Sequence, residues 1–117
     1  MAYADELKAR TQEFALRIIR LSGSLPRTDA ARIVGRQLLR SGTSVGANYR
    51  AACRARSKPD FVSKMGIVLE EADETAYWLE LVVRAHLLPA PRVQALLKEA
   101  NEIVSICVAS LRTAKSG

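Results

Sequence analysis

The chain has 117 residues and a mass of 12.8 kDa, which leaves room for one domain and not two. Hydrophobic residues make up 49% of it, enough to fill a core and too many for a disordered tail. Aromatic residues make up only 5%, so the composition leans towards helices, and a net charge of +6 favours an anionic partner.

Three breaks at prolines divide the chain into four amphipathic segments. They lie at Pro26, at Pro59 and at Pro89–Pro91, and each is a signal for one helix to stop and the next to start. Asp29 and Asp60 follow the first two breaks, where we expect them as N-caps or as acids in the first helical turn.

The first two segments are predicted to be helices with one buried face each. Residues 5–22 carry apolar side chains at the spacing of one helical stripe. Residues 29–57 carry three glycines, each of which costs a helix up to about 1 kcal/mol relative to alanine but lets a second helix approach closely. We predict one helix here, in which residues 42–44 are the place for a kink. The buried positions are Leu7, Phe14, Ile18 and Leu21, then Val34, Leu38, Gly42, Val45, Gly46, Tyr49 and Ala52.

The third and fourth segments, residues 60–87 and 92–113, are also predicted to be helices. Ile67, Trp78 and Leu81 lie among acidic residues, on the side away from the apolar stripe of their helix. They need cover from a neighbouring helix or from a second subunit, so they are the candidate oligomer interface. The buried stripes are Phe61, Met65, Val68, Ala72, Ala76, Leu79 and Val83, then Val93, Leu97, Ala100, Val104, Cys107 and Leu111.

Four such helices with short connections predict an all-α fold, an up-down-up-down antiparallel four-helix bundle that forms a single domain over residues 1–117. The first ten residues carry charges where a signal peptide needs an apolar run, and no apolar stretch approaches the roughly 20 residues of a membrane span. Cys53 and Cys107 are expected to be buried, reduced thiols, with one disulfide as the alternative. We therefore predict a cytoplasmic protein without membrane contact.

The positive charge is concentrated in the first half of the chain. Residues 1–58 carry a net charge of +8 and residues 59–117 one of −2. Six cations of the second segment share a stripe about 80° wide and roughly 39 Å long, nearly opposite its apolar residues. The stripe is either a solvated face, partly paired with acids of the third segment, or a phosphate-binding surface without base stacking. These candidate nucleic-acid-binding residues are Arg32, Arg36, Arg40, Arg50, Arg54 and Lys58.

Residues suited to catalysis are sparse. The single histidine, His86, falls on the core side near the end of the third segment, where we expect a C-terminal cation or a hydrogen-bonded core residue. Acids at residues 70–74 and 99–102 resemble the paired motifs that hold Mg²⁺ in all-α nucleotide pyrophosphohydrolases, but both groups lie away from the core stripes. We predict no catalytic site, no metal and no cofactor, with that Mg²⁺-dependent hydrolase as a remote alternative.

Two stretches of the chain resemble a known family. Residues 37–51 read QLLRSGTSVGANYRA, and residues 60–81 begin with Asp60-Phe61 and end in EEADETAYWLEL. Together they resemble the bacterial four-helix-bundle family named for the 23S rRNA intervening-sequence protein, or S23 family, over about residues 10–112. The resemblance implies a homopentamer, similar in fold to the accessory protein of diversity-generating retroelements. That protein binds nucleic acid and a reverse transcriptase through a basic surface.

The same motif also has a physical interpretation within one chain. Polar residues along one edge of the second helix can face acids of the third, in a buried Arg–Glu and Asn–Glu network that sets the packing register. Where the family often has Glu after Asn-x-x, this chain continues with Arg50-Ala51-Ala52, which makes the cation stripe more basic. The predicted network comprises Arg40, Ser41, Ser44 and Asn48 with Glu70, Glu71 and Glu74.

These observations predict a non-enzymatic homo-oligomer, a pentamer by resemblance, that binds RNA or DNA electrostatically. It would act as an adaptor for another protein, such as a reverse transcriptase. The alternative is a structural or protein-interaction oligomer with no nucleic-acid role. Binding that weakens steeply with salt separates the two.

Overall fold

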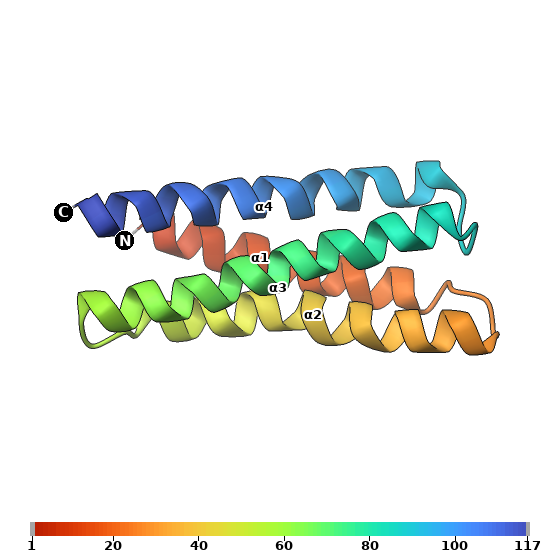
Figure 1. Ribbon diagram of the computed structural model, residues 1–117, viewed down its shortest axis with the longest axis horizontal. Helices are drawn as coiled ribbons and strands as arrows, with labels where there is room; N and C mark the ends of the chain where they lie inside the picture. Colours follow the sequence, from red (N-terminus) through yellow and green to blue (C-terminus); the bar gives the residue numbers. More distant parts are fainter. Residues whose placement is uncertain (1, 117) are drawn as a thin grey trace.

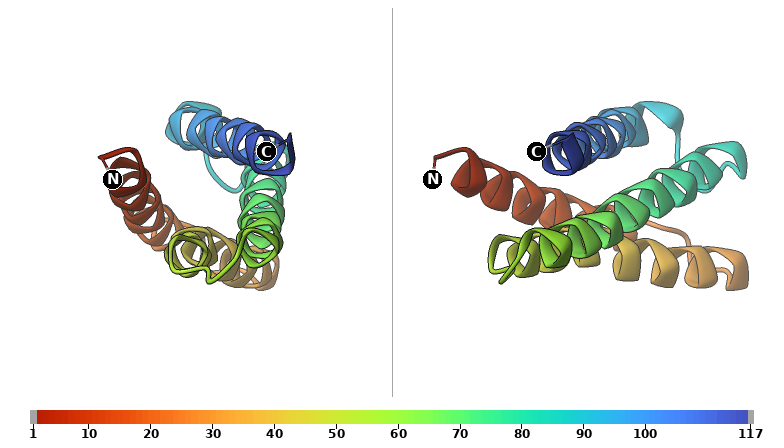
Figure 2. Two further views of the ribbon diagram at one scale, coloured as in Figure 1. Left: turned by 90° about the vertical axis from the view of Figure 1, so that its left-hand side faces the viewer. Right: turned by 60° about the vertical axis from the view of Figure 1, so that its left-hand side comes forward.

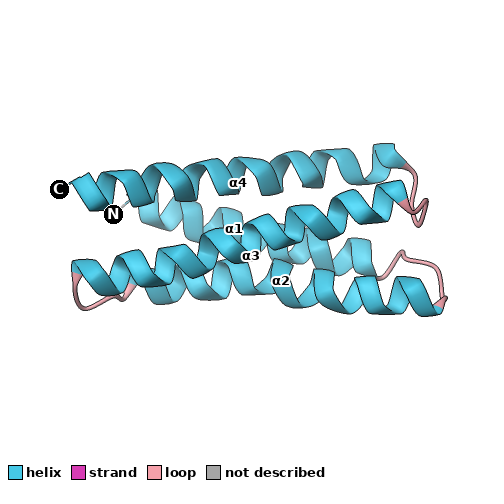
Figure 3. Cartoon of the chain, viewed as in Figure 1, coloured by secondary structure: helices cyan, strands magenta, loops and turns pink. Residues whose placement is uncertain are grey.

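The computed structural model describes residues 2–116, which fold into four long α-helices joined by short loops (Figure 1 and Figure 3). The helices are α1 (Ala2–Ser22), α2 (Asp29–Cys53), α3 (Lys58–Arg84) and α4 (Ala90–Ser116). Each runs antiparallel to the one before it, in a bundle that measures 47 × 21 × 20 Å. The prediction of an all-α, four-helix bundle is confirmed. None of the helices in residues 2–116 has an apolar stretch long enough to span a membrane.

Side chains just before α2 and α3 set where these helices begin. The hydroxyl of Thr28 accepts a hydrogen bond from the amide of Ala31, and that of Ser57 accepts one from the amide of Asp60, both at 3.2 Å. Asp29 and Asp60 therefore lie in the first turn and not at the cap, which is the second of their two expected placements.

Two helices, α2 and α3, end before the residue predicted for them. α2 runs uninterrupted through residues 42–44 but stops at Cys53 instead of residue 57. It stops there because the amide of Arg54 bonds to the carbonyl of Ala51, three residues back, which tightens the last turn. His86 lies just beyond α3, exposed and with a φ of 58°. Its predicted place on the core side is wrong, because the chain leaves the helix before that position.

The buried residues of α3 and α4 recur with a slightly shorter period than the 3.6 residues per turn on which their prediction rested. On α3 the stripe runs through positions 65, 68, 72, 75, 79 and 82, with alternating spacings of three and four, and Ala76 beside it is also buried. That spacing averages 3.5 residues per turn, as in left-handed helix packing, so the buried stripe drifts from the 3.6-residue line. As a result Val82, Leu96 and Ile103 are buried, whereas Val83, Leu97 and Val104, predicted for the core, are half-buried.

Helix α1 is held mainly from one side. α1 packs along α2, α2 along α3 and α3 along α4, but α1 and α4 contact each other least. These two helices diverge towards the end of the bundle that carries both termini (Figure 2). Arg10 of α1 ties them with ion pairs of 2.6 Å to both Glu99 and Glu102, and the hydrogen bond to Glu99 is the main reason that its pKa is raised. The position of α1 therefore depends on its contact with α2.

That contact is close because glycines of α2 face α1. A Cβ at Gly42 would lie 2.8 Å from two side-chain carbons of Ile18. A Cβ at Gly46 would lie 3.2 Å from the hydroxyl oxygen of Thr11. The expectation that these glycines let a second helix approach is confirmed.

Both cysteines are free thiols, so the disulfide alternative does not apply. Cys107 is buried as expected, and burial raises the pKa of its thiol to about 11. Cys53, at the end of α2, is only half-buried.

Substituting Gly42 tests whether the α1–α2 contact limits stability. Gly42→Ala is expected to lower the free energy of unfolding by about 1–2 kcal/mol, because overpacking against Ile18 costs more than the gain in helix propensity. Gly66 on α3 is the matched control, since apart from the adjacent residues and backbone of its own helix no atom lies within 4 Å of the position that a Cβ would take there. Gly66→Ala should stabilise the protein by up to about 1 kcal/mol. Urea unfolding measures both, and equal stabilisation by the two substitutions would contradict the close contact.

Candidate nucleic-acid interface

The six cations of the predicted stripe are all exposed, but they do not form one straight line. Arg32, Arg36, Arg40 and Arg50 lie on α2, whereas Arg54 follows its last residue and Lys58 begins α3. The predicted length of the stripe on a single helix is therefore wrong, because α2 ends before the last two cations. The arginines remain on the side of α2 opposite its buried residues, such as Leu38 and Val45.

Two of the six cations are engaged by acids. Arg32 pairs with Asp29 of its own helix, and Arg40 pairs with Glu71, at 3.2 Å, and with Glu74 of α3. Within residues 2–116 no acid lies within ion-pair distance of the other four cations, which we call the basic face: Arg36, Arg50, Arg54 and Lys58. Part of the stripe is therefore paired with acids, as the solvated-face interpretation expects, and the basic face is not.

Two grooves along α2, one against α1 and one against the loop that precedes α2, bring further cations beside this face. One is lined by Lys8 of α1 together with Arg50 and Arg54. The other, at the opposite end of α2, is lined by Arg27 from the preceding loop with Arg32 and Arg36. The sequence reasoning missed Lys8 and Arg27, because spacing along one helix does not show which residues of another segment lie beside it.

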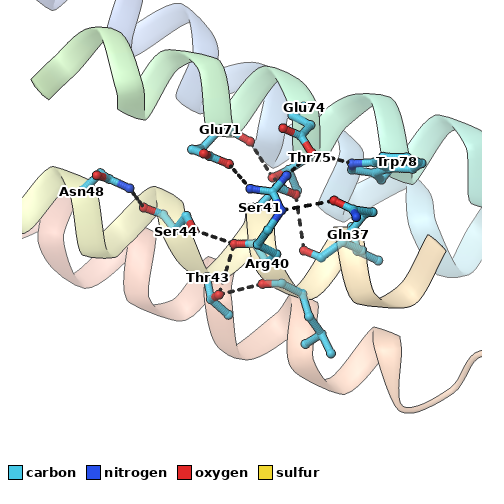
Figure 4. Close-up of polar contacts among 12 residues, drawn as sticks. Gln37, Arg40, Ser41, Thr43, Ser44, Asn48, Glu71, Glu74, Thr75 and Trp78 are labelled. Carbon is cyan, nitrogen blue, oxygen red and sulfur yellow. Dashed lines mark hydrogen bonds and ion pairs between the residues drawn. The ribbon is translucent and has the colours of Figure 1, made fainter. Parts of the chain in front are cut away.

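Arg40 is the centre of a polar network that joins α2 to α3 (Figure 4). Its guanidinium donates to Glu71 and Glu74, and its Nε donates to the side-chain oxygen of Gln37 at 3.1 Å. The indole Nε1 of Trp78 donates to Glu74 at 2.9 Å. These contacts shift both titrating partners: the hydrogen bond to Glu74 raises the pKa of Arg40, and those from Trp78 and Arg40 lower the pKa of Glu74.

Beneath Arg40 the two helices also share a buried hydrogen bond. The hydroxyl oxygens of Ser41 and Thr75 lie 2.9 Å apart, and both side chains are fully buried. The Thr75 hydroxyl is also 2.7 Å from the carbonyl of Glu71, one turn back on α3. Because a buried hydroxyl without a partner is costly, this pair fixes the register between α2 and α3.

The predicted Arg–Glu and Asn–Glu network is only partly correct. Arg40 keeps 48% of its side chain exposed, so the ion pairs are not buried. The amide of Asn48 donates to the carbonyl of Ser44 in its own helix, at 2.8 Å, and does not reach an acid (Figure 4). Glu70 is exposed and takes no part. The three acids lie on one helix at different angles, and only Glu71 and Glu74 face α2.

The three candidate interface residues differ in exposure. Ile67 is 40% exposed, whereas Trp78 and Leu81 are half-buried and pack against the core of their own chain. Tyr77 is exposed and meets Trp78 edge to face, with ring centroids 5.0 Å apart. The outward side of α3 therefore presents Ile67 and Tyr77 most strongly, and Tyr77 was not among the predicted interface residues.

The acidic motifs of the hydrolase alternative are held apart. Glu71 and Glu74 bind Arg40 on the α2 side of the bundle, whereas Glu99 and Glu102 bind Arg10 on the α1 side. Across residues 2–116, no three histidine, cysteine or acidic side chains lie close enough together to hold a metal ion. The described part of the chain does not assemble the carboxylate cluster that this alternative requires.

Known proteins share both the sequence pattern and the fold of this chain. Residues 6–109 match the family described as 23S rRNA-intervening sequence protein. A similar solved structure is that of a protein of unknown function from the S23 ribosomal protein family of Bacteroides thetaiotaomicron. It is 38% identical, the match covers 89% of this chain and 96% of that one, and the TM-score is 0.83. No curated protein matches the chain.

The lowered pKa of Glu74 predicts how the network responds to acid. A carboxyl group with a depressed pKa adds stability above its usual value of 4.5, and this stability is lost as the pH falls through the lower folded value. Glu74→Gln should therefore cost about 0.5–1 kcal/mol at pH 7, as expected for a partly exposed ion pair, and should flatten the loss of stability in acid.

Urea unfolding followed by the fluorescence of Trp78, the single tryptophan, measures this effect. Glu70→Gln is the control, because Glu70 lies on the same helix but outside the network. A Glu74→Gln variant as stable as the Glu70→Gln variant at pH 7 would show that the network does not join the helices.

Proposed function

This chain belongs to the 23S rRNA-intervening sequence protein family, and we propose that it is a non-enzymatic, homo-oligomeric four-helix bundle that binds RNA or DNA electrostatically. One observation carries the proposal. The basic face carries three exposed arginines, Arg36, Arg50 and Arg54, for which residues 2–116 offer no acid partner. Arginine presents a planar fork of donors that suits phosphate oxygens.

The arrangement of charge supports a polyanion in preference to a small acidic ligand. The free cations are spread along α2 and into α3, and the grooves beside them add Lys8 and Arg27. No aromatic side chain lies among the cations of the basic face, so the contacts are to phosphates and carry little sequence preference. In an oligomer the faces of several copies add together, which suits an adaptor that holds nucleic acid beside another protein, such as a reverse transcriptase.

Charge reversal on the basic face tests the proposal. The triple variant Arg36→Glu, Arg50→Glu and Arg54→Glu should abolish binding of a short RNA at about 50 mM salt, because three phosphate contacts become repulsive. The wild-type affinity should fall linearly in a plot of log K against log salt concentration. Fluorescence anisotropy measures both quantities, and circular dichroism checks that the variant keeps its helices.

The matched control places the same charge change elsewhere. Arg84→Glu, Lys98→Glu and Arg112→Glu alter three exposed cations of α3 and α4, of which Arg84 lies in a last helical turn, as Arg50 does. This variant should retain most of the RNA affinity. If both triple variants lose binding equally, net charge and not the basic face is responsible. Unchanged binding in the first variant would refute the proposal.

The second candidate function is an assembly module without a nucleic-acid role. It is favoured by the apolar side chains on the outward side of α3, where Ile67 and Tyr77 are 40% and 56% exposed. A second copy of the chain would cover them together with the exposed edges of Trp78 and Leu81. Both candidate functions include assembly into a homopentamer. They differ only in whether nucleic acid binds.

Light scattering with an interface variant tests the assembly. The wild type should have a mass several times 12.8 kDa, and Ile67→Glu should shift it towards the single chain, because a charge cannot be buried unpaired. Leu16→Glu on α1 is the control, since Leu16 is exposed to a similar extent, 43%, on another helix. A wild-type mass of 12.8 kDa in solution would refute the assembly. It would not affect the test of the basic face, which depends on the charge-reversal variant.

A further inference from the structure

The groove at the Lys8 end of the α1–α2 contact has the form of a binding channel. Its volume is about 560 Å³. One wall is a ridge of α1 that carries Lys8, Gln12 and Ala15, and the other is a ridge of α2 that carries Thr43, Ala47 and Arg50. Each ridge has spacings of four and three residues, so one line of side chains from each helix borders the groove.

Small residues keep this groove open. Its small lining residues are alanines on both helices and Gly46, where α1 comes close enough that even a Cβ would touch Thr11. The helices are thus in contact at the bottom, while the short side chains of Ala15 and Ala47 leave the space above them empty. A longer side chain at either alanine would fill it.

The chemistry of the lining fits an anion. Lys8, Arg50 and Arg54 stand at one end, no acid lines the groove, and none of the three has an ion-pair partner within residues 2–116. Lys8 comes from α1, so the cations lie on both sides of the channel. The lining has no aromatic side chain, and a nucleic-acid base therefore has nothing to stack on.

We propose that this groove holds the sugar–phosphate backbone of a single-stranded RNA or DNA segment, with Lys8, Arg50 and Arg54 on its phosphates. The inference rests on the proposed nucleic-acid binding and adds the route of the strand. A single backbone can lie in the groove above the α1–α2 contact, where the short side chains of Ala15 and Ala47 leave room for it. A duplex is a stiff rod whose two backbones are separated by grooves of roughly 6–12 Å, so it would meet this groove only at the rim.

A neutral substitution that fills the groove tests the route independently of charge. Ala47→Leu should weaken binding of a short fluorescent oligouridylate by about tenfold or more, the equivalent of one lost charge-assisted contact. Ala109→Leu, at an exposed position on α4, is the control and should bind as the wild type does. Binding of an RNA duplex of similar length should be equal in both variants.

The contribution of α1 is tested by Lys8→Gln. It should reduce the slope of log K against log salt concentration by about 0.7, the value for one phosphate contact with a single strand. Lys98→Gln on α4 is the matched control, and its slope should stay at the wild-type value. Both variants keep the helix-forming character of the position.

The outcomes separate this inference from the function on which it rests. If the triple arginine variant loses RNA but Ala47→Leu and Lys8→Gln bind like the wild type, the basic face stands and the groove is refuted. If Ala47→Leu weakens single strand and duplex equally, the preference for a single strand is refuted. If polyglutamate at equal charge concentration displaces the oligouridylate as well as unlabelled RNA does, the groove binds any acidic chain, and the nucleic-acid assignment is overturned.

Discussion

The close contact between α1 and α2 governs the placement of α1 and of the surface that it borders. A Cβ at Gly42 would clash with the side chain of Ile18, and one at Gly46 would be tight against Thr11, so the two helices approach closely at both glycines. α1 has few contacts with α4 and diverges from it at the end that carries both termini. The glycines therefore decide where α1 lies, and with it the groove that α1 forms along α2.

Arginines of α2 have two different environments. Arg40 faces α3, where Glu71 and Glu74 hold it and where the buried Ser41–Thr75 pair fixes the register. Arg36, only one turn away, faces solvent and has no acid partner within residues 2–116. The difference is one of angle around the helix, because 100° per residue over four residues turns a side chain by about 40°.

The residues that carry the family resemblance are, in this chain, largely engaged with one another. Arg40, Glu71, Glu74 and Trp78 form one connected set across α2 and α3, and the set remains partly open to solvent (Figure 4). Such a set stabilises the packing of two helices and at the same time presents a fixed surface beside Ile67 and Tyr77. This explains why the same stretch supports a structural role in the fold and a place in the proposed interface between copies.

Local signals in the sequence were enough to define the helices and most of their buried faces. Proline breaks and apolar periodicity are such signals, so the four helices and core residues such as Phe14, Leu38 and Met65 were predicted correctly. The early end of α2 at Cys53 was not, because no breaker marks it and the helix is closed there by hydrogen bonds of the Arg54 and Ala55 amides to carbonyls three residues back. Along α3 the difference between a 3.6-residue and a 3.5-residue repeat adds up from turn to turn, and Val82 is therefore buried in place of Val83.

Packing between helices determined which cations are free and what lies beside them. Arg32 pairs with an acid of its own helix, but the pairing of the other arginines of α2 depends on a different helix. Arg40 meets two acids of α3, while Arg50 meets none within residues 2–116. Lys8 joins Arg50 and Arg54 only because the glycine contact brings α1 alongside α2. Spacing within one helix determines the direction in which each side chain points from the helix axis. The neighbours that a side chain meets in that direction are distant in the chain, and they depend on how the helices pack.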